Sequence, residues 1–83
     1  MFTVSPNAIV RKIDEKILII NTTTGTASLL DDVATDYFEA IKQATCIEDV
    51  YEYFLLNYDV DISQVVTDVE TFLFQMRELG IYV

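Results

Sequence analysis

The chain has 83 residues, of which 52% are apolar, and its 14 carboxylates against five Lys and Arg residues give a net charge of −9. A domain of this size buries only about 60–65% of its extended-chain surface, so its large side chains are expected in one core, with little left for an enclosed active site. His is absent, and a single cysteine, Cys46, excludes both an intrachain disulfide and a thiolate zinc site. The composition therefore favours a binding module without metal or cofactor over an enzyme.

No segment of the sequence predicts secretion or a membrane span. Residues 1–6 show no basic stretch before a long apolar run, and no apolar run approaches the roughly 20 residues of a spanning helix. Together with the single cysteine, this predicts one cytoplasmic domain over residues 1–83 that has no membrane partner.

The first third of the chain is predicted to form three strands, over residues 8–13, 16–21 and 26–30. Asp14-Glu15 separates the first two, and residues 22–25 form a turn in which Gly25 is free to adopt positive φ. The apolar run of the second strand suits a central, well-covered position, whereas the short, partly polar third strand suits an edge. Loops this short favour antiparallel pairing in the order one-two-three.

After Leu30 the apolar spacing becomes helical, which predicts helices over residues 32–44, 46–57 and 62–79. Gly80 would end the third helix in a left-handed conformation. The residues expected to cap the helix starts are Asp31 or Asp32, the pair Thr45 and Glu48 at capping-box spacing, and Asp61 or Ser63.

Each predicted helix has an apolar face for the core. The faces of the first two helices are Val33, Ala34, Tyr37, Phe38 and Ile41, and Ile47, Val50, Tyr51, Phe54 and Leu55. The third has the broadest face, which comprises Val65, Val66, Val69, Phe72, Leu73, Met76 and Leu79. The predicted fold is α+β and winged-helix-like, a three-stranded antiparallel sheet followed by three helices.

The charges are unevenly distributed. Residues 1–30 sum to +1, and residues 31–83 sum to −10 because twelve carboxylates face only Lys42 and Arg77. An acidic surface repels phosphate backbones and tolerates basic peptides. A winged-helix protein that binds nucleic acid would need cations on its third helix, and Arg77 is the only one there. We therefore expect no nucleic-acid partner; an acidic winged-helix subunit that recognises a folded protein is an open alternative.

Candidate reactive groups have simpler structural explanations. The closest carboxylate sets are Asp31 and Asp32, Asp59 and Asp61, and Asp68 and Glu70, and helix caps or solvated surfaces account for them. The stretch around Asp59 lacks the glycine and downstream glutamate of a calcium loop. Cys46 lies in the predicted first turn of a helix with no evident partner, so it is expected to be a small buried apolar residue.

Several short motifs follow one another in a characteristic order. They are Ile17–Ile20 with Asn21, Gly25, Leu30-Asp31, Ala34 and Phe38, Tyr58-Asp59-Val60, Asp68-Val69, Phe72-Leu73, Met76 and Gly80-Ile81. In this order and spacing, over nearly the whole chain from about residue 8, they resemble the PqqD-like family, also called RiPP recognition elements. Three positions depart from the family: Phe38 replaces a frequent Trp, and Ala27 and Ser28 are small where Tyr or Arg is usual.

The resemblance implies a non-catalytic domain that binds the leader segment of a ribosomal precursor peptide. The leader would add as an antiparallel strand to the third strand and lie in the trough beside the third helix. The precursor would be delivered to modifying enzymes, with the leader peptidase and cyclase of lasso-peptide biosynthesis favoured. A pyrroloquinoline-quinone-type peptide chaperone for a radical enzyme is the alternative.

The expected peptide-binding residues form two groups. The strand group comprises Thr26, Ala27, Ser28 and Leu29, and the helix group comprises Val65, Asp68, Val69, Phe72 and Met76. For Val69, Phe72 and Met76, ordinary core packing is a competing interpretation. Leu30, Phe38 and Leu73 are assigned to the core.

Overall fold

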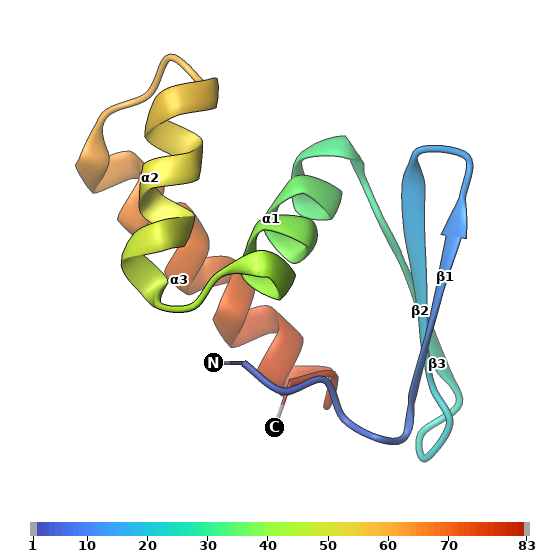
Figure 1. Cartoon of the computed structure of the whole chain (residues 1–83). Coiled ribbons are helices and arrows are strands. Elements are labelled where there is room, and N and C mark those ends of the chain that lie inside the picture. The colour runs from blue at the N-terminus through green and yellow to red at the C-terminus, as the bar shows by residue number, and fades with distance from the viewer. Residues whose placement is uncertain (1, 83) are drawn as a thin grey trace.

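The computed structural model describes residues 2–82 and contains a three-stranded sheet followed by three helices (Figure 1). The sheet has the order β1-β2-β3, and both pairs of neighbours are antiparallel. This is the predicted α+β architecture. The elements are β1 (Ala8–Ile13), β2 (Lys16–Asn21), β3 (Thr26–Leu30), α1 (Asp32–Gln43), α2 (Ile47–Asn57) and α3 (Ile62–Glu78).

The strand boundaries agree with the prediction because the two turns carry clear local signals. Asp14, between β1 and β2, has a φ of 56°, and Gly25, before β3, has a φ of 72°. Asn and Asp tolerate this left-handed region better than other side chains, and Gly adopts it without steric cost. The register places Ile9 opposite Ile20, and Ile20 opposite Ala27.

The helix boundaries agree with the prediction to within one residue. Asp31 caps α1 by accepting a hydrogen bond from the backbone N–H of Ala34 (2.8 Å), as predicted. Asp61 caps α3 in the same way by accepting from Gln64 (2.9 Å). Each cap satisfies a backbone donor that the first helical turn leaves free.

The start of α2 corrects two predictions. The N-cap is Cys46, and Asp49 accepts hydrogen bonds from the N–H groups of Thr45 (3.0 Å) and Cys46 (3.4 Å), so the pair Thr45 and Glu48 does not form the capping box. The capping residues lie one position later than predicted, because the side chain of Asp49, three residues after Cys46, folds back over the helix start. Cys46 is exposed at this position, so its predicted burial was wrong.

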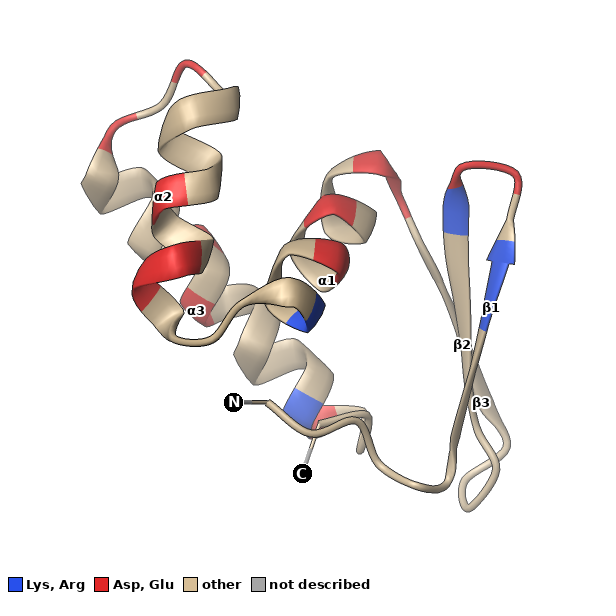
Figure 2. Ribbon diagram, in the orientation of Figure 1, with Lys and Arg blue, Asp and Glu red and all other residues tan. Residues whose placement is uncertain are grey.

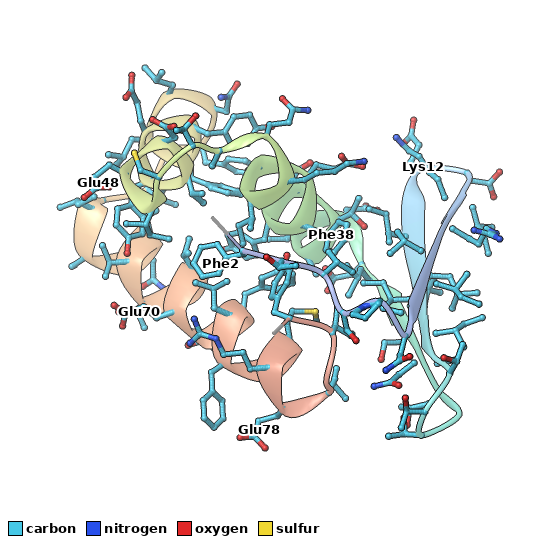
Figure 3. The ribbon with its side chains drawn as sticks, turned by 60° about the horizontal axis from the view of Figure 1, so that its bottom comes forward. Phe2, Lys12, Phe38, Glu48, Glu70 and Glu78 are labelled. Carbon is cyan, nitrogen blue, oxygen red and sulfur yellow. The ribbon has the colours of Figure 1, made fainter. Side chains whose placement is uncertain are left out.

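The hydrophobic core lies between the sheet and the helices. Ile19, Val50 and Val69, from β2, α2 and α3, have no exposed surface. Leu30, Phe38 and Leu73 are buried as predicted, and Figure 3 shows Phe38 pointing between the helices and the sheet. A core that draws on every layer needs all three helices in place.

Three further predictions of burial were wrong. Val33 is 49% exposed because it lies at the solvent side of the first turn of α1, and Leu55 is 41% exposed on the far side of α2. The helices cover only one face of the sheet (Figure 1), so β2 is central but not covered on both sides. Leu18 and Ile20, on its uncovered face, are half-buried.

A buried asparagine joins the sheet to the end of α3. The side-chain amide of Asn21 donates a hydrogen bond to the carbonyl of Leu79 (3.0 Å), and its carbonyl accepts from the N–H of Thr23 (2.9 Å). Gly80 ends α3 with a φ of 72°, as predicted, and a Cβ at that position would lie 2.8 Å from Asn21 Nδ2. The turn before β3 is therefore held against the end of α3.

Candidate functional site

The open edge of the sheet belongs to β3, and the hydrogen bonds of β2 show which backbone groups face it. The N–H of Thr22 donates to the carbonyl of Asn7 (2.8 Å), so the backbone of Thr22 points toward β1. Because antiparallel strands alternate direction residue by residue, Asn21 and Ile19 point toward β3, where they pair with Thr26 and Ser28.

The same alternation assigns the remaining residues of β3. Thr26, Ser28 and Leu30 turn their N–H and C=O groups toward β2, whereas Ala27 and Leu29 turn theirs toward the open edge. Only two of the four predicted edge residues therefore present backbone groups to an incoming strand. The side chain of Ser28 is half-buried on the helix side, and that of Leu29 is 60% exposed on the opposite side.

A cavity of about 310 Å³ lies between the first turns of α1 and the middle of α3, and Asp31, the residue that follows β3, also lines it. It continues into a pocket of about 150 Å³ that Phe54, Tyr58, Val60 and Val65 help to line. Both share Val33, Tyr37 and Asp68. We call the two together the trough; the residues that line its larger part are Asp31, Val33, Ala34, Tyr37, Asp68, Thr71, Phe72 and Gln75.

The predicted helix group lies mainly beneath this trough. Val65, Val69, Phe72 and Met76 are each at most 4% exposed, since α3 packs them against α1 and α2. Asp68 alone is half-buried at the trough surface. The structure therefore brings Asp68 and the edges of Phe72 and Val65 to the trough, and it places Val69 and Met76 in the core.

Sequence reasoning missed the residues that form most of the trough surface. Thr71 lies three residues after Asp68, and Gln75 lies four residues after Thr71, so the three side chains form one stripe along α3 beside the buried face. Val33 and Tyr37 line the opposite wall because α1 begins two residues after β3 ends. The helical spacing from Asp68 could have identified the first pair.

Two tyrosines link carboxylates to the trough walls. Burial, and after it the charge of Asp68 and a hydrogen bond to that carboxylate, raise the pKa of Tyr37. The hydroxyl of Tyr58 donates to the carboxylate of Asp36, and this bond, with a smaller contribution from burial, raises the pKa of Tyr58 to about 12. Both phenols are neutral at physiological pH and serve as donors.

The helices carry most of the acidic side chains, and three of the five cations lie on the hairpin of β1 and β2 (Figure 2). Within residues 2–82, no three His, Cys, Asp or Glu side chains come together as candidate metal ligands. None of the helices in that same range combines the length and apolarity needed to cross a bilayer. An unpaired strand edge such as that of β3 can accept an extended peptide as a further strand.

The chain is thus an α+β domain with an open sheet edge at β3 and a trough lined by α1 and α3. Residues 16–81 match the family model for coenzyme PQQ synthesis protein D (PqqD). This match covers most of the chain, and the protein belongs to the PqqD family. The resemblance that the sequence motifs suggested is thereby confirmed.

Two solved structures share the fold. One shows TbiB1 in complex with the TbiA(beta) leader peptide; it is 21% identical, with a TM-score of 0.88 over 96% of this chain and 93% of that chain. The other shows a lasso peptide synthetase B1 complexed with the leader peptide; it is 18% identical, with a TM-score of 0.90 over 99% and 96% of the two chains. No curated protein matches the sequence.

Proposed function

We propose that this chain binds the leader segment of a ribosomal precursor peptide and presents the precursor to the enzymes that modify it, without catalysing a reaction itself. The leader adds as an antiparallel fourth strand on β3 and places its side chains in the trough. Its enzymes are a leader peptidase and a cyclase of lasso-peptide biosynthesis. The unpaired edge of β3 beside the trough is the observation that carries the proposal, and both similar structures contain a leader peptide.

The energetics require both the edge and the trough. Ala27 and Leu29 present two N–H and two C=O groups, and each hydrogen bond contributes about 0.5–1.5 kcal/mol net. Ordering an extended leader costs about 1–2 kcal/mol per residue, which the backbone bonds alone do not offset. Burial of leader side chains against Tyr37 and Phe72, at about 25 cal/mol per Å², supplies the remainder.

The proposal is tested by titrating the isotope-labelled chain with the synthetic leader of its precursor and following the backbone amides. We expect the largest shifts at Ala27 and Leu29 and along the trough at Tyr37, Thr71 and Gln75. The outward-facing amide of Lys12, on the opposite edge of the sheet, is the internal reference. Shifts confined to β1, or no saturable binding, would contradict the proposal.

A further inference from the structure

The face of the sheet that the helices leave uncovered has an unusual composition, and we call it the outer face. The register and the alternation of side chains place five large aliphatic residues on it: Ile9, Ile13, Leu18, Ile20 and Leu29. Ile9, Ile13 and Leu29 are 37%, 49% and 60% exposed. The solvent-exposed face of an antiparallel sheet normally carries polar residues. Exposed aliphatic residues at these positions therefore indicate a contact surface.

The charges of the outer face have one sign. Arg11 and Lys16 are its only charged residues on the three strands, although the chain has 14 carboxylates. The carboxylates of the hairpin, Asp14 and Glu15, lie in the turn at its tip (Figure 2). An apolar surface flanked by cations is complementary to an apolar patch flanked by Asp and Glu.

A leader strand on β3 would enlarge this face. Residues that lie opposite one another in antiparallel strands project to the same side. Leader residues opposite Ala27 and Leu29 would therefore continue two outer-face rows, Ile9–Ile20–Ala27 and Arg11–Leu18–Leu29. A protein docked there would contact the domain and the leader together.

The dimensions indicate why the leader matters for docking. Three strands of about six residues, with a rise of about 3.3 Å per residue and a spacing of about 4.8 Å, present roughly 300 Å². A stable interface buries about 800 Å² on each partner. The outer face of the free domain is too small for tight binding, and an added strand with its flanking leader residues extends it.

A second copy of the chain fits this face poorly. Stacking two outer faces would bring Arg11 and Lys16 of both copies together, and each copy carries a net charge of −9. Like charges across an interface oppose association. The occupant is instead a different protein with an acidic rim.

We propose that the outer face docks the enzyme that acts on the leader-bound precursor, which presents an apolar patch rimmed by carboxylates and binds the leader-loaded domain more tightly than the free domain. This inference rests on the proposed leader binding at β3. The leader would thus bind the edge of β3, and the enzyme would bind the outer face of the same sheet.

The test uses the full chain, the precursor and the purified enzymes that process it. The variant Arg11→Glu/Ile13→Asp changes the outer face, and Lys12→Glu is the matched control, because Lys12 neighbours both residues but projects to the helix side. Leader affinity is first measured without enzymes and should agree within about two-fold among all three chains, since β1 is remote from the β3 edge. The rate of precursor conversion at limiting enzyme should fall on the order of ten-fold for the double variant alone.

Each outcome of this experiment distinguishes the docking proposal from an alternative. Equal conversion by the double variant and Lys12→Glu would overturn the docking proposal, and so would an enzyme that binds free and leader-loaded domain equally. Sedimentation that shows an Arg11-dependent dimer would assign the face to self-association instead. Failure of the wild-type chain to bind leader would remove the proposed function itself. If the double variant does not fold, Lys16→Glu tests the same rim at the exposed start of β2.

Discussion

The two edges of the sheet contrast sharply, although both strands leave backbone groups unpaired by the sheet. Along β1, the Ala8 N–H is already bonded to the carbonyl of Ser5 (3.0 Å), and Arg11 and Lys12 place charges near the rest of the edge. Along β3, residues 26–29 carry no charge, and Asp31, directly after the strand, lines the trough. Proteins use charges and local contacts to protect edge strands from unwanted pairing with other strands. By this criterion β1 is protected and β3 can pair with a further strand.

This contrast separates a charged, locally bonded edge from an uncharged one. The outward groups of β1 belong to Val10 and Lys12, and those of β3 belong to Ala27 and Leu29. What distinguishes them is the strand itself, because Arg11, Lys12 and the Ala8 bond protect β1 and nothing comparable protects β3. Pockets lie near both strands, one lined by Val10 of β1 and the other by Asp31, which follows β3. Four experiments sharpen the contrast, in order of decreasing expected effect.

The largest effect concerns the helix that backs the trough. Phe72→Ala should lower the free energy of unfolding by about 3–5 kcal/mol, because Phe72 is 4% exposed in the core. Phe74→Ala, on the same helix and 63% exposed, should change it by at most about 0.5 kcal/mol. Chemical denaturation measures both. A stable Phe72→Ala chain that no longer binds leader would assign Phe72 to the peptide wall instead of the core.

The next effect concerns the edges themselves. Ala27→Pro removes an outward N–H from β3 and leaves a leader carbonyl without a donor, which costs about 1–3 kcal/mol of binding, or roughly ten-fold or more in Kd. Lys12→Pro removes the equivalent donor from β1 and should leave Kd unchanged. Anisotropy of a labelled leader gives both values. Equal losses would show that the leader does not pair with β3.

Two glycines with the same φ of 72° test the link between β3 and α3. Gly25→Ala should cost about 1 kcal/mol of folding stability through left-handed strain alone, since its Cβ meets no atom within 4 Å. Gly80→Ala adds a contact of 2.8 Å with Asn21 Nδ2 and disturbs the bond to Leu79, for a total of about 2–3 kcal/mol. Thermal denaturation measures the difference. Identical costs would mean that Asn21 moves away freely.

The smallest effect is an alkaline one at the end of the trough. The pKa of Tyr58 is raised from 10.0 in the unfolded chain to about 12, chiefly by its bond to Asp36. Its stabilising contribution is fully present below pH 10 and is lost as the pH rises through about 12. Tyr58→Phe should flatten this part of the stability profile, whereas Tyr53→Phe, on the exposed side of α2, should not. The same slope in both variants would contradict this assignment.

The fold was largely predictable because local signals mark its boundaries. Asp31, Asp61 and Gly80 end or begin helices through their own side-chain or backbone properties, and these act within a few residues. The start of α2 was misplaced because Thr45 with Glu48 and Cys46 with Asp49 have the same spacing, and the structure uses the second pair. Local pattern does not decide between two adjacent pairs.

The edge position of β3 was predictable from the sequence, but the lining of the trough was not. A short, partly polar strand predicts an edge position, and β3 lies at the edge of the sheet. The broad apolar stripe of α3 does not reveal which residues face the core and which face a groove, because that depends on how α1 and α2 pack. Val69 and Met76 are buried, and the polar residues Thr71 and Gln75 line the trough in their place.

The bond between Asn21 and Leu79 joins residues 58 positions apart in the chain. It ties the end of β2, just before the turn to β3, to the end of α3, so the sheet and this helix are fixed relative to one another. In the proposed complex, binding would then order the leader alone, without a rearrangement of the sheet against α3. Association should accordingly show a single kinetic phase whose rate rises linearly with leader concentration, with no plateau from a slow opening step.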